Sequence, residues 1–71
     1  MKIRNEKKRR SWEYGWTSYF MDWTHERTVR LATKSPYLDE AAAQRGWEMA
    51  ATIDFENDGN QGSFNRFCPY I

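Results

Sequence analysis

Hydrophobic and polar positions alternate most regularly after Gly46. The apolar series is Trp47, Met49, Ala51, Ile53 and Phe55, and the residues between them are Glu48, Ala50, Thr52, Asp54 and Glu56. Because successive side chains of a strand point to opposite faces, this pattern predicts a half-buried strand over residues 47–56. Residues 57–62 are rich in types that tolerate positive φ and read as a loop. Residues 63–68 are expected to return as an edge strand, which Pro69 limits.

The aromatic segment over residues 12–22 fits two periods. A helical stripe would contain Trp12, Trp16, Tyr19, Phe20 and Trp23, and strict alternation would contain Trp12, Tyr14, Trp16 and Phe20. Gly15, Thr17 and the density of aromatic residues are unfavourable for a helix and favourable for a strand, so we predict a strand. Residues 23–26 then form a turn and residues 27–33 a second strand.

One short helix is predicted over residues 36–45. Ser35 can cap its first turn, and Pro36 suits the first helical position. Gly46 is of the type that ends a helix in a left-handed conformation. The element order is therefore β-β-α-β-β, an α+β fold with an antiparallel sheet of three to four strands and one helix packed on one face.

Composition argues against metal sites and catalysis. The 71 residues contain one cysteine, Cys68, and one histidine, His25. One cysteine cannot form a disulfide within the chain, and two soft ligands are fewer than the four of a usual zinc site. His25 lies between two acids in the predicted turn, without a nucleophile or a glycine-rich phosphate loop. We therefore expect a non-enzymatic protein without cofactor or metal.

The expected location is the cytoplasm. No apolar run approaches the roughly 20 residues that cross a bilayer, and the basic start is not followed by the apolar stretch of a secretory signal. The unpaired cysteine and the lack of a glycosylation sequon also favour an intracellular setting.

Charge is distributed unevenly along the chain. Residues 1–10 carry six Lys or Arg and one Glu, a net charge of +5, so the remaining 11–71 carry −4. The sequence predicts a mobile basic tail over residues 1–10 and a single acidic α+β domain over residues 11–71. In the tail, the candidates for contact with nucleic-acid phosphates are Lys7, Lys8, Arg9 and Arg10. The tail could equally serve only to keep the protein soluble.

A first candidate partner surface lies at the end of the aromatic segment. Tyr19, Met21 and Trp23 would fall together on the open face of the predicted first strand, as in an interface. They could also be stacking platforms for single-stranded nucleic acid, although the same strand lacks flanking Lys or Arg. A twist, a bulge or the tail could instead cover them.

A second candidate surface is acidic. Glu48, Asp54 and Glu56 share the polar face of the predicted strand over residues 47–56, and Asp58 extends them into the loop. Alternate strand residues lie about 6.6–6.8 Å apart, so the carboxylates could imitate a phosphate track and occupy a basic groove of a partner. They could also only keep that strand soluble.

In length and architecture, with the helix SPYLDEAAAQRG and the acidic strand after it, residues 11–71 resemble the small one-helix α+β proteins that phages and plasmids encode, anti-CRISPR inhibitors among them. The resemblance implies a non-catalytic inhibitor or adaptor that occludes a protein or ribonucleoprotein complex, and it assigns no residue a role. The alternatives are a small nucleic-acid-binding accessory protein and a subunit of a larger assembly, including a homodimer.

Overall fold

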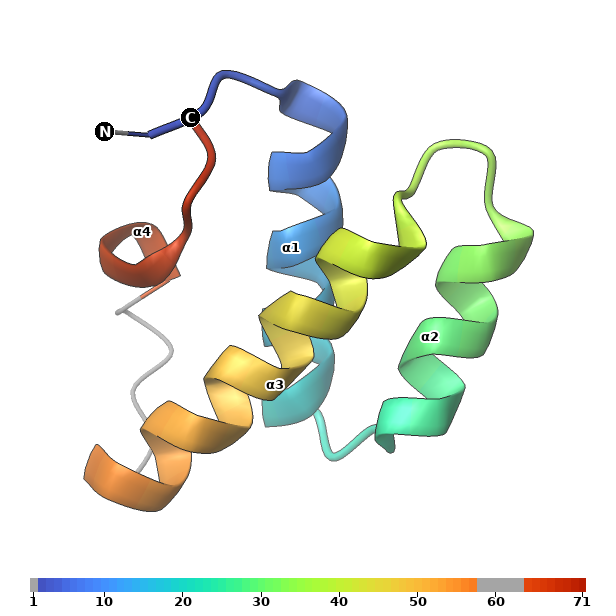
Figure 1. Ribbon diagram of the computed structural model, residues 1–71. Helices are drawn as coiled ribbons and strands as arrows, with labels where there is room; N and C mark the ends of the chain where they lie inside the picture. The colour runs from blue at the N-terminus through green and yellow to red at the C-terminus, as the bar shows by residue number, and fades with distance from the viewer. Residues whose placement is uncertain (1, 58–63) are drawn as a thin grey trace.

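The computed structural model describes residues 2–57 and 64–71, and most of these residues are helical (Figure 1). The helices are α1 (Glu6–Phe20), α2 (His25–Lys34), α3 (Glu40–Asn57) and the single turn α4 (Phe64–Phe67). Within these ranges the extended pairing is one isolated parallel bridge between Ile3 and Tyr70. The predicted α+β fold with a β-β-α-β-β sheet is therefore wrong.

Helix α1 follows the helical stripe, which was one of the two interpretations of the aromatic segment. The Asn5 side chain caps the helix by accepting a hydrogen bond from the backbone amide of Lys8 at 3.0 Å. Trp12 and Trp16, one turn apart, are each 2 % exposed, and their rings stack at a centroid distance of 5.3 Å. Stacking of this kind adds about 0.5–1.5 kcal/mol to the free energy gained by burial.

Two glycines allow α1 and α3 to touch backbone to backbone. A Cβ on Gly15 would lie 1.9 Å from the carbonyl oxygen of Ala43, and one on Gly46 would lie 2.1 Å from the carbonyl oxygen of Trp12. Both residues are buried within their helices. The helix predicted to stop at Gly46 instead starts at Glu40 and runs through it. The low helix propensity of glycine is outweighed by the close crossing that only glycine permits.

The alternation over residues 47–56 was misleading because small residues conceal the helical period. Ala43, Gly46, Ala50 and Ile53 are buried at spacings of three and four residues, the period of a helix face. Ala50, assigned to the polar side of the predicted strand, is 0 % exposed. The predicted strand over residues 27–33 is likewise helix α2, with Thr28 and Ala32 buried one turn apart.

The two ends of the chain meet at one side of the molecule (Figure 1). The Ile3 amide donates to the Pro69 carbonyl at 2.9 Å, and the Ile71 amide donates to the Ile3 carbonyl at 2.8 Å. Cys68 and Tyr70 are buried in the same core cluster as the tryptophans. Of the segment predicted to be a mobile tail, Glu6–Arg10 form the start of α1. Its mobility stays a prediction.

Helix α3 crosses in front of α1 in Figure 1, with α2 beside them. The Cα positions extend 33 × 30 × 14 Å, so the molecule is a slab about two helix layers thick. Each of the longer helices therefore keeps one exposed side. Among the helices described, none has the length and apolar character needed to cross a membrane.

Candidate interaction surface

The side of α1 that faces away from α3 forms one wall of an open hollow. A helix turns about 100° per residue, which puts Arg10, Tyr14, Thr17 and Met21 opposite the buried tryptophans of α1. The hollow measures about 390 Å³ and is lined by Arg10, Glu13, Tyr14, Thr17, Ser18, Met21 and Trp23. We call it the α1 hollow. Met21 is 58 % exposed at its rim.

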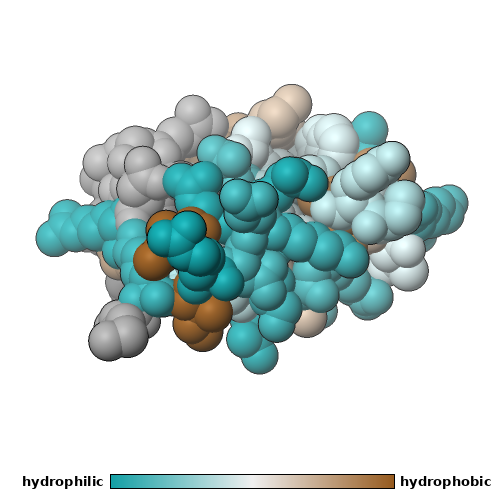
Figure 2. All heavy atoms as spheres, turned by 90° about the horizontal axis from the view of Figure 1, so that it is seen from above, coloured by the Kyte–Doolittle hydropathy of each residue, from teal (hydrophilic) through white to brown (hydrophobic). Residues whose placement is uncertain are grey.

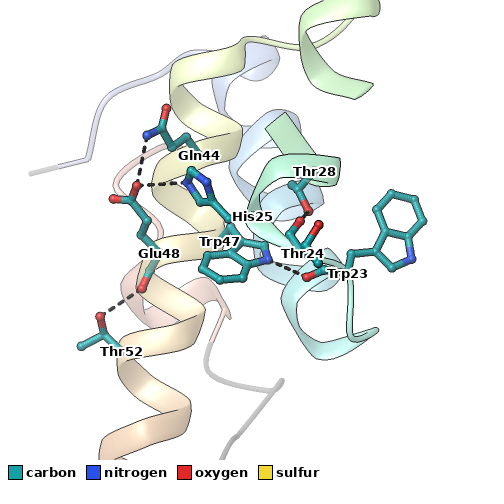
Figure 3. A network of polar contacts seen from close by, with 8 residues as sticks. All are labelled: Trp23, Thr24, His25, Thr28, Gln44, Trp47, Glu48 and Thr52. Carbon is teal, nitrogen blue, oxygen red and sulfur yellow. Dashed lines mark hydrogen bonds and ion pairs between the residues drawn. The ribbon is translucent and has the colours of Figure 1, made fainter. Parts of the chain in front are cut away.

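Trp23 is held at the corner between α1 and α2 by its backbone. Asp22 adopts a φ of 63°, and the amide of Trp23 donates to the Ser18 carbonyl at 3.0 Å. The carbonyl of Trp23 accepts a hydrogen bond from Nε1 of Trp47 at 3.0 Å. With both backbone groups paired, the half-buried indole points away from α3 (Figure 3).

Two side chains contact the indole of Trp23. The ring of Tyr14 meets it edge-on at a centroid distance of 6.2 Å, and the hydroxyl of Tyr14 donates to the Thr28 carbonyl at 2.9 Å. Burial raises the pKa of Tyr14, and a hydrogen bond with Ser18 and the positive charge of Arg27 partly oppose that rise. The guanidinium carbon of Arg27 lies 4.3 Å from the indole centroid, a cation–π geometry.

The exposed side of α2 carries a row of cations. Arg27, Arg30, Leu31 and Lys34 follow a helical spacing and, with Thr24 and Glu26, line a second open hollow of about 490 Å³. We call these four residues the α2 stripe. Arg30 pairs with Glu26 one turn earlier, and both side chains are largely exposed. Arg27 connects the two hollows, because it lines the second one and stacks on Trp23, which lines the first.

A polar network fixes the start of α2 against α3 (Figure 3). Nε2 of His25 lies 3.3 Å from Oε2 of Glu48, which also accepts a hydrogen bond from Nε2 of Gln44 at 3.2 Å. The His25 ring meets Trp47 edge-on at 5.1 Å.

Most of the cations lie in the first half of the chain and most of the acids in the second half. Residues 1–34 hold nine Lys or Arg against four Asp or Glu, and residues 35–71 hold two against six. The net charges are therefore +5 for the part with α1 and α2, and −4 for the part with α3. Lys7, Lys8 and Arg10 are exposed in the first turns of α1. Seen from the end where α1 begins, the surface is largely hydrophilic, with a small hydrophobic group near the termini (Figure 2).

The three aromatic-segment residues predicted to share a surface line two hollows, because Tyr19 shares a hollow of about 410 Å³ with Trp23 but not with Met21. Met21 and Trp23 line the α1 hollow. Tyr19 is half-buried and turned towards α3, where its hydroxyl donates to Oδ2 of Asp54 at 2.7 Å. This hydrogen bond, followed by burial and by the negative charges of Asp54 and Asp22, raises the pKa of Tyr19.

The predicted row of carboxylates does not form, because the strand that would align it is a helix. Glu48 and Asp54 are six residues apart on α3, which separates them by about 240° around the axis. Glu48 pairs with His25, and Asp54 with Tyr19. The side chain of Glu56 and the position of Asp58 lie outside the described residues. A partner-binding role for any of these acids stays a prediction.

The sequence interpretation missed the α2 stripe and Tyr14. Their spacing was visible in the sequence, since Arg27, Arg30 and Lys34 recur at three and four residues. The assignment of residues 27–33 to a strand concealed it. Lys7, Lys8, Arg9 and Arg10 were named as phosphate contacts and fall in the first two turns of α1, with Arg9 half-buried. Their role in binding stays a prediction.

No family model matches the chain, and the searches of curated proteins and of solved structures find no match either. In the part of the chain that the structure describes, no group of three or more His, Cys, Asp or Glu is placed to hold a metal ion.

Proposed function

We propose that this protein is a non-enzymatic nucleic-acid-binding module that contacts phosphates with the exposed sides of α1 and α2. The observation that carries the proposal is the gathering of cations on surfaces that do not pack on α3. They are Lys7 and Arg10 on α1, and Arg27, Arg30 and Lys34 on α2. Lys and Arg that neutralise phosphates release condensed counterions, which supplies most of the affinity for nucleic acids.

The helical fold changes the order of the two main functional expectations. An inhibitor that imitates nucleic acid would need aligned carboxylates, and α3 points Glu48 and Asp54 in different directions. The resemblance to anti-CRISPR inhibitors rested on a sheet that the described residues do not contain. The positive surface, in contrast, is larger than the tail alone, because α2 extends it with three further cations.

The pairing of Arg30 with Glu26 does not remove Arg30 from this surface. An exposed ion pair of this kind contributes about 0–1 kcal/mol, so a phosphate can replace the carboxylate at little cost. Arg27 is held more firmly, since it stacks on Trp23. A guanidinium in that position still presents its edge N–H groups to a phosphate oxygen.

The test is the salt dependence of binding to a labelled oligonucleotide, followed by fluorescence anisotropy. With three to five phosphate contacts, the logarithm of the association constant should fall with that of the salt concentration at a slope of about −2 to −3.5 for a single strand. Replacing Arg10 and Arg27 together by Gln should reduce that slope by about 1.4. The matched control is Arg45→Gln, an exposed arginine on α3.

The control variant should bind like the wild type. The proposal is wrong if the wild type does not bind at low salt, or if Arg45→Gln weakens binding as much as the double variant does. Circular dichroism of each variant confirms that the helices persist, so that a loss of affinity is not a loss of fold.

A protein-binding inhibitor or adaptor is the second candidate. It is favoured by the exposure of Met21 at 58 % beside Tyr14 and Trp23, since Met, Tyr, Trp and Arg are enriched in protein interfaces. The test is a pull-down with this protein as bait after nuclease treatment. A partner protein that is retained by the wild type and by Tyr37→Glu, on the exposed loop after α2, but not by Met21→Glu, would support this function.

A further inference from the structure

The α1 hollow has a largely apolar interior, with Arg10 and Glu13 in its lining and Arg27 stacked on its Trp23. Tyr14, Met21 and Trp23 supply apolar or aromatic surface between the two arginines, with Arg10 in the second turn of α1 and Arg27 over Trp23. A surface that contacted only phosphates would need cations and no exposed methionine beside an indole. The arrangement instead fits a ligand that is anionic at its edges and apolar and planar in its middle.

The length of the hollow agrees with a short run of nucleotides. Arg10 and Met21 are eleven residues apart on or at the end of α1, which corresponds to about 16.5 Å at a rise of about 1.5 Å per residue. Phosphates of a stacked strand advance about 3.4 Å each along the helix axis, and an unstacked strand is more extended, so this distance spans at most about five of them. That corresponds to the lower end of the site sizes of about 4–16 nucleotides known for single-strand-binding folds.

We infer that the nucleic acid bound by this surface is single-stranded, and that an unstacked base enters the α1 hollow against Met21 and Trp23 while Arg10 and Arg27 hold the neighbouring phosphates. The inference rests on the proposed function and adds the class of ligand. In a duplex the faces of the bases are covered by their neighbours, so an apolar hollow between the arginines would remain unfilled. In a single strand the base faces are accessible to indole and guanidinium planes.

The fold supplies what the aromatic segment lacks in sequence. The segment has no Lys or Arg directly beside Met21 and Trp23. Helical spacing places Arg10 on the same side of α1 as Met21, and the corner at Asp22 turns the chain so that Arg27 reaches Trp23. The cations and the aromatic surface therefore meet only in the folded protein.

The decisive experiment compares ligands of equal charge on the wild-type protein. Labelled oligothymidylate of about 15 nucleotides is measured against an abasic strand with the same number of phosphates, and against a duplex of the same length. The abasic strand should bind about 5- to 150-fold more weakly than oligothymidylate, the range that corresponds to the loss of one stacked base. The duplex should also bind more weakly than the single strand.

Two variants localise the effect. Met21→Ala should lower the affinity for oligothymidylate and leave the affinity for the abasic strand almost unchanged. Trp23→Leu also removes the ring on which Arg27 stacks, so it should lower both affinities, and the affinity for oligothymidylate more strongly. Met21 is exposed, so its variant keeps the test valid if Trp23→Leu unfolds. The matched control is Tyr37→Leu, an aromatic residue that is 72 % exposed outside this surface, which should change neither affinity.

Other results would overturn the inference in recognisable ways. Equal affinity for oligothymidylate and the abasic strand would show that only phosphates are bound, which leaves the proposed function intact. Tighter binding of the duplex, or displacement of oligothymidylate by polyglutamate of equal charge at equal concentration, would exclude single strands as the preferred ligand. Failure to bind any of these polyanions at low salt would end the proposed function as well.

Discussion

Gly46→Ala gives the most direct test of the contact between α1 and α3. In an exposed helix interior this change stabilises a protein by about 1 kcal/mol, because alanine has the higher helix propensity. Here the new Cβ would lie 2.1 Å from the Trp12 carbonyl oxygen and 2.9 Å from its carbon, whereas ordinary contacts begin at 3.4 Å. The obstructing atoms belong to the backbone, so no side-chain rotation relieves the clash.

The loss of stability expected for Gly46→Ala follows from the distance by which α1 and α3 would have to move apart. The shortfall exceeds 1 Å, and a gap of about 0.5–1 Å already forfeits a quarter to a half of the dispersion energy between facing atoms. Overpacking costs up to about 3 kcal/mol, which exceeds the gain in propensity by about 2 kcal/mol. A domain of this size has about 3–5 kcal/mol of stability, so the variant should lose roughly half of it.

The assay is thermal unfolding followed by circular dichroism, with urea unfolding followed by tryptophan fluorescence. A loss of about 2 kcal/mol lowers the Tm by about 8–16 °C in a domain of this length. Thr52→Ala introduces the same residue at an exposed position of α3 and should cause no such loss. If Gly46→Ala were as stable as Thr52→Ala, or more stable than the wild type, the backbone contact would not exist as described.

Three further predictions follow from local geometry. The pKa values of Tyr19 and Tyr14 are raised, so the fold favours their protonated phenols. Their contribution to the free energy of unfolding is therefore complete below about pH 10, the pKa in the unfolded chain, and is lost as the pH rises through the folded-state pKa values. Tyr19→Phe should therefore flatten the decline of the urea midpoint above about pH 10. Asp22→Gly should maintain or raise the Tm, because glycine has no penalty at positive φ, whereas Asp22→Val should cost about 1–2 kcal/mol. Deletion of residues 1–10 should lower the Tm, since it removes the cap of α1, worth about 1 kcal/mol, and the pairing with the C-terminal segment.

Each of these has a clear contrary result. If the urea midpoint of Tyr19→Phe declined as steeply above about pH 10 as that of the wild type, the hydrogen bond from Tyr19 to Asp54 would not be the cause of the decline. A lower Tm for Asp22→Gly would mean that the carboxylate contributes more than the backbone conformation costs. An unchanged Tm after the deletion would agree with the mobile tail predicted from the sequence and would place the stable domain at residues 11–71.

The sequence determined the properties that depend on composition and on local chemistry. A single cysteine excludes an internal disulfide, and the twelve aromatic residues indicate where a short chain finds its core. The helical stripe with Trp12 and Trp16 was visible as one of two periods, and the charge asymmetry between the ends was readable directly. Met21 and Trp23 could be named as candidates for a binding surface.

The tertiary structure alone decided the fold and the composition of that surface. Gly15 and Gly46 count against a helix when each is judged by its own propensity, yet at a crossing of two backbones their missing Cβ is what allows the helices to approach each other so closely. Ala50 was assigned to the polar side of a predicted strand, although it is buried against α1, because the burial of so small a residue depends on which neighbour the fold places beside it. Arg27 likewise reaches Trp23 only after the chain turns at Asp22, since contacts across a corner depend on backbone geometry that hydrophobic periodicity does not encode.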